Sequence, residues 1–502
     1  MFLTQSKYDT CKYDTPKYDY SEYFYCSLCM GAYMPDFVNR TEELTRLRTL
    51  FDSDDAELAV VYGRRRIGKT RLVKQALEDH DDTVLYQTRQ KTRTLQLGQF
   101  VERAADAFPG IERIRQDWEP LFEYLADQDA IVVLDEFPYL VEQDQSLPSV
   151  LQALFDHEFE GSAATFVLVG SSISMMEEAT LLGDSPLYGR SSLRLDVRQL
   201  PFDAAFEFLP DDATSDDTVR AWSVFGGVPY YLEELDPSVS LGKNIHRTVL
   251  TRHGSLHDEP EYVLRMELQE PTRYFSILEA IAGGATGRNE IAGATGIEYN
   301  QLSKYLDRLS RLRLVERRVP VTERPERSKR SQYRIRDPIF RFWFRFLYGS
   351  PDRYDEVGDG AYERLIEPQM PDFVASAFEE LCCRALWTLY DEYPLVDVGK
   401  WWYQDHEVDV VGLTDADVLI AGECKYRASP ADFSVLSSLE DRVEELRWTP
   451  DSGGDRTCKY ALFSRNGYTD AVRDAAAERS DLRLYSVSDV VDVLTGINGE
   501  RS

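Results

Sequence analysis

The residues with the clearest chemical capability form a loop rich in glycine and basic side chains. Residues 63–70 read GRRRIGKT and match G-x-x-x-x-G-K-[ST]. Its glycines let successive backbone N–H groups surround a phosphate, and the helix that follows adds positive charge. Lys69 should contact the β/γ-phosphates, and the Thr70 hydroxyl should hold Mg²⁺. The loop predicts an ATP site that includes Gly63, Arg64, Arg65, Arg66, Ile67, Gly68, Lys69, Thr70 and Arg71.

Two adjacent carboxylates end an apolar run further along the chain. Residues 130–136 read AIVVLDE. We predict that Asp135 enters the Mg²⁺ shell and that Glu136 is the base that orients the attacking water. Such an ending alone means little, because a strand that reaches solvent often ends in acidic residues. Together with the phosphate loop it predicts ATP hydrolysis, with Lys69 and Glu136 as catalytic groups.

Two further polar positions accompany later apolar runs. Ser171 follows residues 165–170, where its hydroxyl either senses the γ-phosphate or caps a loop. Arg190 precedes residues 193–197 and is either a finger that stabilises charge on a neighbouring subunit's nucleotide or an exposed side chain. The finger interpretation implies a homo-oligomer, which the sequence leaves open.

Four segments together resemble the archaeal-type ATPases of the AAA/STAND group. They are FVNR at 37–40 with EL at 43–44, the loop GRRRIGKT, LDEF at 134–137, and GVP at 227–229 followed by YL at 231–232. The resemblance covers roughly residues 35–350. In that family the Asn-Arg segment lies near the adenine, and the Gly-x-Pro segment belongs to a helical subdomain that contacts the nucleotide. On this resemblance alone we expect Asn39, Arg40 and Pro229 to bind ATP.

A second group of acidic residues lies near the C-terminus. Glu379 is on a predicted helix, Asp409 lies within EVDVV, and Glu423 and Lys425 end an apolar run. Strand alternation puts Glu423 and Lys425 on one face and Cys424 on the other. Two or three carboxylates hold Mg²⁺, and a nearby lysine positions water and stabilises charge on phosphate. The arrangement suits phosphodiester cleavage.

These C-terminal residues resemble the PD-(D/E)XK nuclease superfamily. Asp409, Glu423 and Lys425 match its strand motif as catalytic residues, and Glu379 matches the helix acid, with Glu380 as the alternative. The resemblance implies that the metal ligands are Glu379, Asp409 and Glu423. Val-Asp replaces the usual Pro-Asp. Combined with the upstream ATPase, the chain is similar to archaeal ATPases that carry the domain of unknown function 234. Whether this fold cleaves DNA or is catalytically idle is left open.

A basic segment lies between these two groups. Residues 301–346 hold 14 Lys and Arg against 5 Asp and Glu, whereas the whole chain has a net charge of −31. The pattern at 290–309 suits a helix-turn-helix, and 312–319 with 332–335 suit the strands of a wing. The basic wing would contact DNA, or it would act as an interdomain lever whose arginines pair with acidic residues of the same chain.

Alternating apolar runs and helical stretches must position these residues. The predicted fold class is α/β: a P-loop NTPase parallel sheet, a helical subdomain plus a winged helix, and a restriction-endonuclease-like C-terminal domain. The expected segments are 1–33 (disordered, with KYDT repeats), 34–202 (ATPase domain), 203–270 (helical subdomain), 271–348 (winged helix), a linker at 349–360, and 361–495 (nuclease-like domain). A lone C-x-x-C at Cys26 and Cys29 lacks a second pair of zinc ligands.

Composition narrows the class of protein. The chain has 502 residues, enough for about three domains. No run of about 18 apolar residues is present, so no membrane span is expected. Seven irregularly spaced cysteines indicate a reducing compartment, so we predict a cytoplasmic protein. The 57 basic residues include few lysines, and this acid-rich balance suggests a halophilic source.

Overall fold

The structure is a computed structural model that describes residues 37–159, 161–210, 212–268, 270–450, 453 and 455–496. The KYDT repeats and the C-x-x-C pair at Cys26 and Cys29 lie outside these ranges. Within them, no helix is both long and apolar enough to cross a membrane.

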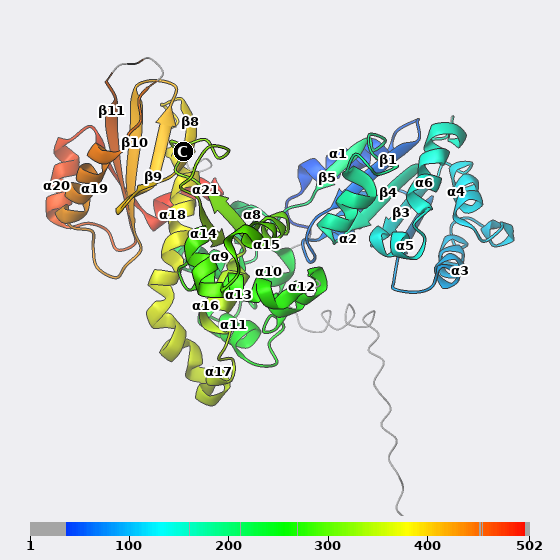
Figure 1. The fold of residues 1–502 in the computed structure, drawn as a ribbon, viewed down its shortest axis with the longest axis horizontal. Coiled ribbons are helices and arrows are strands. Elements are labelled where there is room, and N and C mark those ends of the chain that lie inside the picture. Colours follow the sequence, from blue (N-terminus) through cyan, green and yellow to red (C-terminus); the bar gives the residue numbers. More distant parts are fainter. Residues whose placement is uncertain are drawn as a thin grey trace, which may run out of the picture.

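The first part of the chain forms a five-stranded parallel sheet in the order β2-β3-β4-β1-β5 (Figure 1). The sequence pattern predicts strands at 58–62, 83–86, 130–134, 165–170 and 193–197. Each observed strand lies within a residue or two of one of these positions, and the predicted parallel sheet is confirmed. Consecutive strands are joined through helices, as parallel pairing requires. The strands are β1 Glu57–Tyr62, β2 Thr83–Gln87, β3 Ile131–Asp135, β4 Thr165–Gly170 and β5 Leu193–Asp196.

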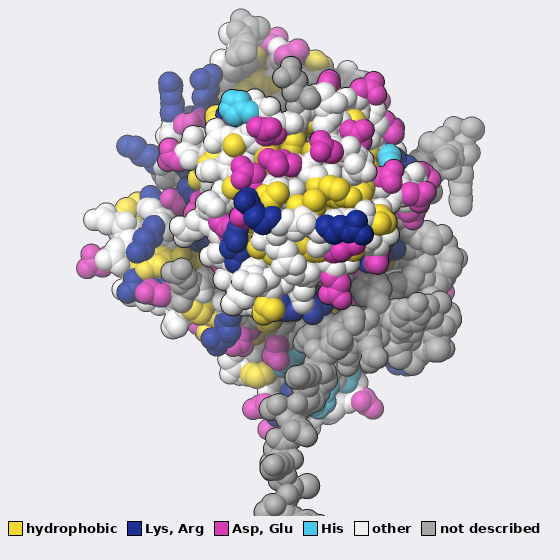
Figure 2. All heavy atoms as spheres, turned by 90° about the vertical axis from the view of Figure 1, so that its right-hand side faces the viewer, with side chains coloured by type: hydrophobic (Ala, Val, Ile, Leu, Met, Phe, Trp, Pro, Cys, Tyr) yellow, Lys and Arg dark blue, Asp and Glu magenta, His cyan; other side chains and the backbone are white. Residues whose placement is uncertain are grey.

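Helices cover both faces of this sheet because its strands are apolar on both sides. Leu58 and Val60 pack into one core with the helices α3 to α6, whereas Ala59 and Val61 pack into the other with α1 and α2. These helices are α1 Thr41–Phe51, α2 Lys69–Ala76, α3 Arg93–Ala104, α4 Trp118–Ala126, α5 Phe137–Gln143 and α6 Leu147–Ala153. Acidic side chains are spread over the face of the molecule shown in Figure 2.

A helical region follows, and its elements occur in the predicted order. Two helices at the predicted helix-turn-helix, α14 Arg288–Thr295 and α15 Tyr299–Arg311, precede an antiparallel pair, β6 Val315–Arg318 and β7 Gln332–Ile335. The aromatic residues of α16 Pro338–Phe346 are buried. The other helices of this region are α8 Phe202–Phe206, α9 Ser215–Phe225, α10 Pro229–Glu233, α11 Leu241–Ile245, α12 Glu259–Glu267 and α13 Pro271–Ala282.

The predicted linker at 349–360 is instead helical. It contains α17 Asp352–Val357 and a short 3-10 helix, Gly358–Gly360. Tyr354 is 3% exposed, and its hydroxyl donates a hydrogen bond to the Phe346 carbonyl at 2.5 Å. Because the stretch is mostly polar, its composition did not indicate that Tyr354 is buried. The burial of Tyr354 attaches the stretch to the neighbouring helices.

The C-terminal part forms a mixed five-stranded sheet in the order β12-β11-β10-β9-β8. The helices α18 and α21 pack on one face, and α19 and α20 pack on the other. The sequence pattern predicts helices at 373–392 and around 436–446 and strands at 396–402, 407–412, 418–425 and 460–464, which correspond to α18, α19 and the strands β8 to β11. It does not predict α20, β12 or α21. The bounds are α18 Met370–Leu389, β8 Leu395–Tyr403, β9 His406–Thr414, β10 Val418–Lys425, α19 Phe433–Glu445, β11 Thr457–Ser464, α20 Asp470–Glu478, β12 Leu482–Ser486 and α21 Val487–Thr495.

One cluster of buried apolar side chains extends from Leu200 to Val491. It includes the helical region, the pair β6 and β7, and the face of the C-terminal sheet that α18 and α21 cover. Polar contacts reinforce this junction, because Asp216 on α9 accepts hydrogen bonds from Arg465 at 2.7 and 2.9 Å. The predicted division into domains therefore falls within a continuous core, and it stays a prediction.

Candidate nucleotide site and C-terminal carboxylate cluster

The phosphate loop connects β1 to α2, and two of its glycines adopt conformations that other residues avoid. Gly63 has φ 149° and Gly68 has φ 86°. A Cβ on Gly63 would lie 2.3 Å from the Val197 carbonyl oxygen, so only glycine fits against β5. Gly68 directly precedes the first turn of α2. The backbone therefore has the curled shape and the helix N-terminus that bind phosphate.

Lys69 lies across this loop. Its Nζ donates hydrogen bonds to the carbonyl oxygens of Gly63 and Arg64, both at 2.9 Å. The residue is 5% exposed, and burial lowers the pKa of Lys69 to about 8, although Glu136 and Asp135 favour its charged form. Two backbone carbonyl groups thus hold the Lys69 ammonium inside the loop.

Thr70 and Asp135 meet although they are far apart in the sequence. The Thr70 Oγ1 donates a hydrogen bond to Asp135 Oδ2 at 2.8 Å. Both lie at the carboxyl edge of the parallel sheet, where β1 and β3 end. Burial raises the pKa of Asp135, which the Thr70 hydrogen bond opposes. A hydroxyl oxygen beside a carboxylate is a donor set that fits Mg²⁺.

Glu136 and Ser171 also lie together. Glu136 has φ 56°, and its carboxylate accepts hydrogen bonds from the Ser171 Oγ at 2.6 Å and the Ser171 N–H at 3.2 Å. They are neighbours because β3 and β4 are adjacent strands that end at the same edge. In this structure the Ser171 hydroxyl therefore orients the predicted base, a partner that sequence reasoning did not identify.

The side chains of the loop arginines point to protein partners outside the loop. Arg64 forms a buried ion pair with Asp337, donates a hydrogen bond from Nη2 to Tyr231 Oη at 3.2 Å, and lies 4.9 Å above the Phe340 ring. Asp337 is 0% exposed and caps α16 through the Phe340 N–H. The Asp-Pro sequence at 337–338 is a helix N-cap signal, but nothing local could have paired it with Arg64.

The side chains of Arg65, Arg66 and the adjacent Arg71 of α2 also contact protein groups outside the loop. Arg65 Nη2 donates a hydrogen bond to Tyr139 Oη at 2.9 Å. Arg66 pairs with Glu259 at 3.0 Å, and Arg71 pairs with Glu233 at 2.6 Å. The loop therefore offers its backbone, rather than these side chains, to a phosphate.

The ATPase resemblance also implies that Asn39, Arg40 and Pro229 bind the nucleotide, and the structure gives each of them a different position. Arg40 is buried and its Nη2 lies 3.4 Å from the Ile67 carbonyl oxygen, while its N–H donates to the side chain of Asn39 at 2.5 Å. Pro229 lies beside Gly68, 4.0 Å from the position of a Cβ there. Arg40 and Pro229 therefore border the phosphate loop, whereas Asn39 is exposed and contacts the Arg40 N–H.

Arg190 is placed differently. It pairs with Asp156 at 2.8 Å and, among the described residues, has no recorded contact with the loop. This arrangement favours the alternative of a surface arginine paired within its own chain.

In the C-terminal cluster an unpredicted lysine lies among the acidic residues. Lys400 Nζ is 2.8 Å from Glu379 Oε2 and 3.7 Å from Asp409 Oδ1, and it also pairs with Glu407. Burial by itself lowers the pKa of Lys400, but these three carboxylates outweigh burial and raise it. Lys400 is therefore charged at neutral pH. It was missed because it lies outside the motif.

The other predicted ligands also have protein partners. Glu423 contacts Lys425 at 2.5 Å and Arg442 at 3.0 Å. Asp409 Oδ2 accepts the Cys424 N–H at 3.0 Å. Burial, together with Glu379 and Glu423, raises the pKa of Asp409 to about 7. Among the described residues, no three His, Cys, Asp or Glu side chains are arranged to hold a metal ion. The residues expected from the nuclease resemblance are thus close together but do not fit Mg²⁺ as they stand.

Several arginines of the basic segment are used within the chain. Arg318 and Arg334 pair with Glu316 of β6 and Glu380 of α18. Glu380, the alternative to Glu379 as the helix acid, is therefore paired with arginines of β6 and β7. The Val321 N–H donates to the Lys400 carbonyl at 2.9 Å, so the loop between β6 and β7 lies against β8. These contacts favour the lever interpretation over full exposure to DNA.

Comparison with known proteins identifies the family. Residues 37–235 match an ATPase domain found predominantly in Archaea, and residues 343–437 match the domain of unknown function 234. The chain is 32% identical over 386 residues to an uncharacterized protein of Methanocaldococcus jannaschii, covering 76% of this chain and 85% of that protein. The chain belongs to this archaeal ATPase family and carries the domain of unknown function 234, as the resemblance implied.

Other similarities are more limited. An uncharacterized ATP-binding protein of Methanocaldococcus jannaschii is 51% identical over 43 residues, or 9% of this chain and 73% of that protein. A Walker-type ATPase of Pyrococcus abyssi has a TM-score of 0.47 and 19% identity, covering 62% of this chain and 96% of that one. The ORC2 protein of Aeropyrum pernix, in its ADPNP and ADP complexes, has a TM-score of 0.39 and 16% identity. The match covers 66% of this chain and 95% of that one.

Proposed function

We propose that this protein is a Mg²⁺-dependent ATPase whose phosphate loop controls the packing of the C-terminal half. The observation that carries the proposal is the 2.8 Å hydrogen bond between Thr70 and Asp135, which puts both predicted Mg²⁺ ligands at the mouth of the loop. Membership of an ATPase family independently implies nucleotide binding.

The neighbouring residues divide the chemistry among them. Lys69 would exchange its two carbonyl partners for β/γ-phosphate oxygens. Thr70 and Asp135 would hold Mg²⁺, which when bound neutralises charge developing on the phosphates. Glu136 would accept a proton from the attacking water, with its carboxylate oriented by Ser171. Arg40 and Pro229 border the loop and Asn39 adjoins Arg40, and we propose that these three residues contact the nucleotide.

The coupling would run through the loop arginines. Arg64 connects the loop to the first turn of α16, and Arg66 connects it to Glu259 on α12. A loop that rearranges around a triphosphate must move or break these ion pairs. Because such a pair is costly to break when buried, the helices would follow the loop. ATP binding and hydrolysis would thus act as a switch.

Two substitutions test the ATPase. Lys69→Ala should abolish ATP binding. Glu136→Gln should still bind ATP but should hydrolyse it at least about 100-fold more slowly than wild type. Lys74→Ala is the matched control, because Lys74 is an exposed lysine on the same helix. Binding is measured by calorimetry and turnover by phosphate release. A wild-type protein that neither binds nor hydrolyses ATP would contradict the proposal.

DNA contact is a second candidate function, and a specific observation favours it. Arg324, Arg327 and Lys329 are exposed on the loop between β6 and β7, apart from the arginines that pair with carboxylates. We propose that these three residues contact DNA phosphates. Replacing all three with alanine should lower the slope of log affinity against log salt by about 2 to 3.

The control for this experiment replaces Arg46, Arg103 and Arg115, three exposed arginines near the parallel sheet. It should leave the salt slope unchanged. Equal slopes for wild type and the wing variant would show that the wing does not bind DNA.

A further inference from the structure

An ammonium group stands at the centre of the cluster that the nuclease resemblance assigns to a metal. Lys400 Nζ contacts Glu379 at 2.8 Å, Asp409 at 3.7 Å, and Glu407. These carboxylates come from α18 and β9, so they approach the ammonium from two elements. Three of these side chains are largely enclosed, with 19% of Lys400, 19% of Glu379 and 11% of Asp409 exposed, whereas Glu407 is half exposed.

The pairing of β8 with β9 brings Lys400 opposite Asp409 and Val410. The pairing is regular from Asp397 to Gly399, which faces Val411, but resumes only at Trp401 and Val408. One residue of β8, Lys400, therefore faces two residues of β9. The bulge is thus on β9 at Asp409 and Val410, and such a bulge redirects a side chain of its own strand. The Val321 N–H also donates to the Lys400 carbonyl, which fixes the strand at this point.

The rest of the cluster is neutralised by cations from the same chain. Glu423 contacts Lys425 at 2.5 Å and Arg442 at 3.0 Å. Mg²⁺ requires carboxylate oxygens at about 2.0–2.1 Å in an octahedral shell. An ammonium at 2.8 Å from Glu379 already takes the place of such an ion, and its charge would repel one brought nearby.

We infer that Lys400 takes the place of the divalent cation, so that the carboxylates join α18, β8 and β9 without metal and the wild-type cluster does not bind Mg²⁺ or Mn²⁺. The same geometry means that removing the ammonium alone opens a cation site between Glu379 and Asp409. This inference does not depend on ATP hydrolysis.

Mn²⁺ titration without nucleotide tests it. All variants are made in an Asp135→Asn background, which removes the candidate ligand at the phosphate loop. Lys400→Met, which keeps the length of the side chain but not the charge, should bind Mn²⁺ at least about tenfold more tightly than wild-type Lys400. Adding Asp409→Asn should remove that gain. Bound Mn²⁺ is measured by electron paramagnetic resonance.

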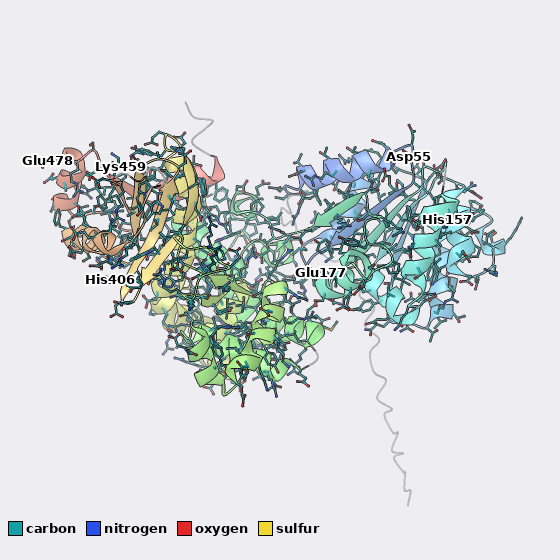
Figure 3. The ribbon with its side chains drawn as sticks, turned by 45° about the horizontal axis from the view of Figure 1, so that its top comes forward. Asp55, His157, Glu177, His406, Lys459 and Glu478 are labelled. Carbon is teal, nitrogen blue, oxygen red and sulfur yellow. The ribbon has the colours of Figure 1, made fainter. Side chains whose placement is uncertain are left out.

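The matched control is Lys459→Met. Lys459 lies on β11 of the same sheet, and Figure 3 places it and His406 at opposite ends of that sheet. His406 begins β9 beside the cluster, so Lys459 is remote from the carboxylates. This control should leave Mn²⁺ binding unchanged. If it strengthened binding as much as Lys400→Met does, the effect would reflect net charge and the inference would fail.

The wild-type cluster provides a measurement that does not depend on how Lys400→Met folds. With Lys400 in place, Asp409→Asn should leave Mn²⁺ affinity unchanged. A loss of tenfold or more would show that the cluster already binds metal and would overturn the inference. A folded Lys400→Met that binds Mn²⁺ no better than wild type would overturn it as well.

Discussion

At the scale of single residues, burial decides how Lys69 behaves. An exposed lysine stays charged well above neutral pH, but burial lowers the pKa of Lys69 to about 8. Its hydrogen-bond partners in this structure are backbone carbonyls rather than anions. The side chain is therefore close to losing its proton, and a phosphate that binds there would restore the preference for the charged form.

This predicts a pH dependence of ATP binding. Above about pH 8 the free protein has a neutral Lys69, so binding must take up a proton, and affinity should fall by up to about tenfold per pH unit. Calorimetry in buffers of different ionisation enthalpy measures the proton uptake. Lys69→Arg, which stays protonated, should show none. A flat affinity from pH 7 to 10 in the wild type would contradict the assigned role.

At the scale of elements, the pair β6 and β7 is joined to α18 by charge rather than by apolar packing alone. Glu316 on β6 pairs with Arg318 and Arg334, and the same arginines pair with Glu380 on α18. Burial by itself raises the pKa of Glu316, but the two guanidinium groups outweigh burial and hold it at about 2. The hairpin is thus attached by a carboxylate that must stay ionised.

The free energy of unfolding should therefore depend on Glu316 at low pH. Because its pKa is lower in the folded state, the stabilisation is complete above about pH 4.5 and is lost as pH falls toward 2. Glu316→Gln should lower the free energy of unfolding by about 1–2 kcal/mol at pH 7 and by almost nothing near pH 2. The value at pH 7 takes into account that the ion pairs are partly exposed to solvent. Urea unfolding of wild type and variant at both pH values measures this difference in the free energy of unfolding. Glu326→Gln, on an exposed residue of the same hairpin, should have little effect at either pH.

At the scale of the whole molecule, the buried pair of Arg64 and Asp337 joins the nucleotide site to the continuous core. Asp337 also accepts a hydrogen bond from Gln199 at 3.2 Å, next to β5. The pair therefore connects the phosphate loop, the edge of the parallel sheet and α16. A change at the loop has a direct physical route to the C-terminal half.

A double-mutant cycle tests this connection. Arg64→Met and Asp337→Leu should each lower the free energy of unfolding by about 3–5 kcal/mol, because each leaves a buried charge unpaired. The double variant should lose less than the sum. The control is the pair of exposed Arg71 and half-buried Glu233, with a coupling of about 1 kcal/mol or less. Additive losses at Arg64 and Asp337 would show that the pair is not coupled.

Much of the architecture followed from local patterns. Five short apolar runs separated by helices predicted the parallel sheet, and the motif at 63–70 predicted its phosphate loop. In contrast, α20, β12 and α21 were not predicted, and the polar stretch at 349–360 was wrongly expected to be a linker. Burial of Tyr354 and Val490 depends on neighbours distant in the sequence, so local composition did not show it.

The order of amino acids alone was enough to locate the phosphate loop and the acid pair at 135–136, because each is contiguous and its chemistry depends on the local backbone. The folded molecule was needed to show that Arg64 turns away to Asp337, that Ser171 orients Glu136, and that Lys400 stands among the C-terminal carboxylates. Charges exert their effects through space, so the identity of a charged group's partner is decided only when the strands and helices are packed.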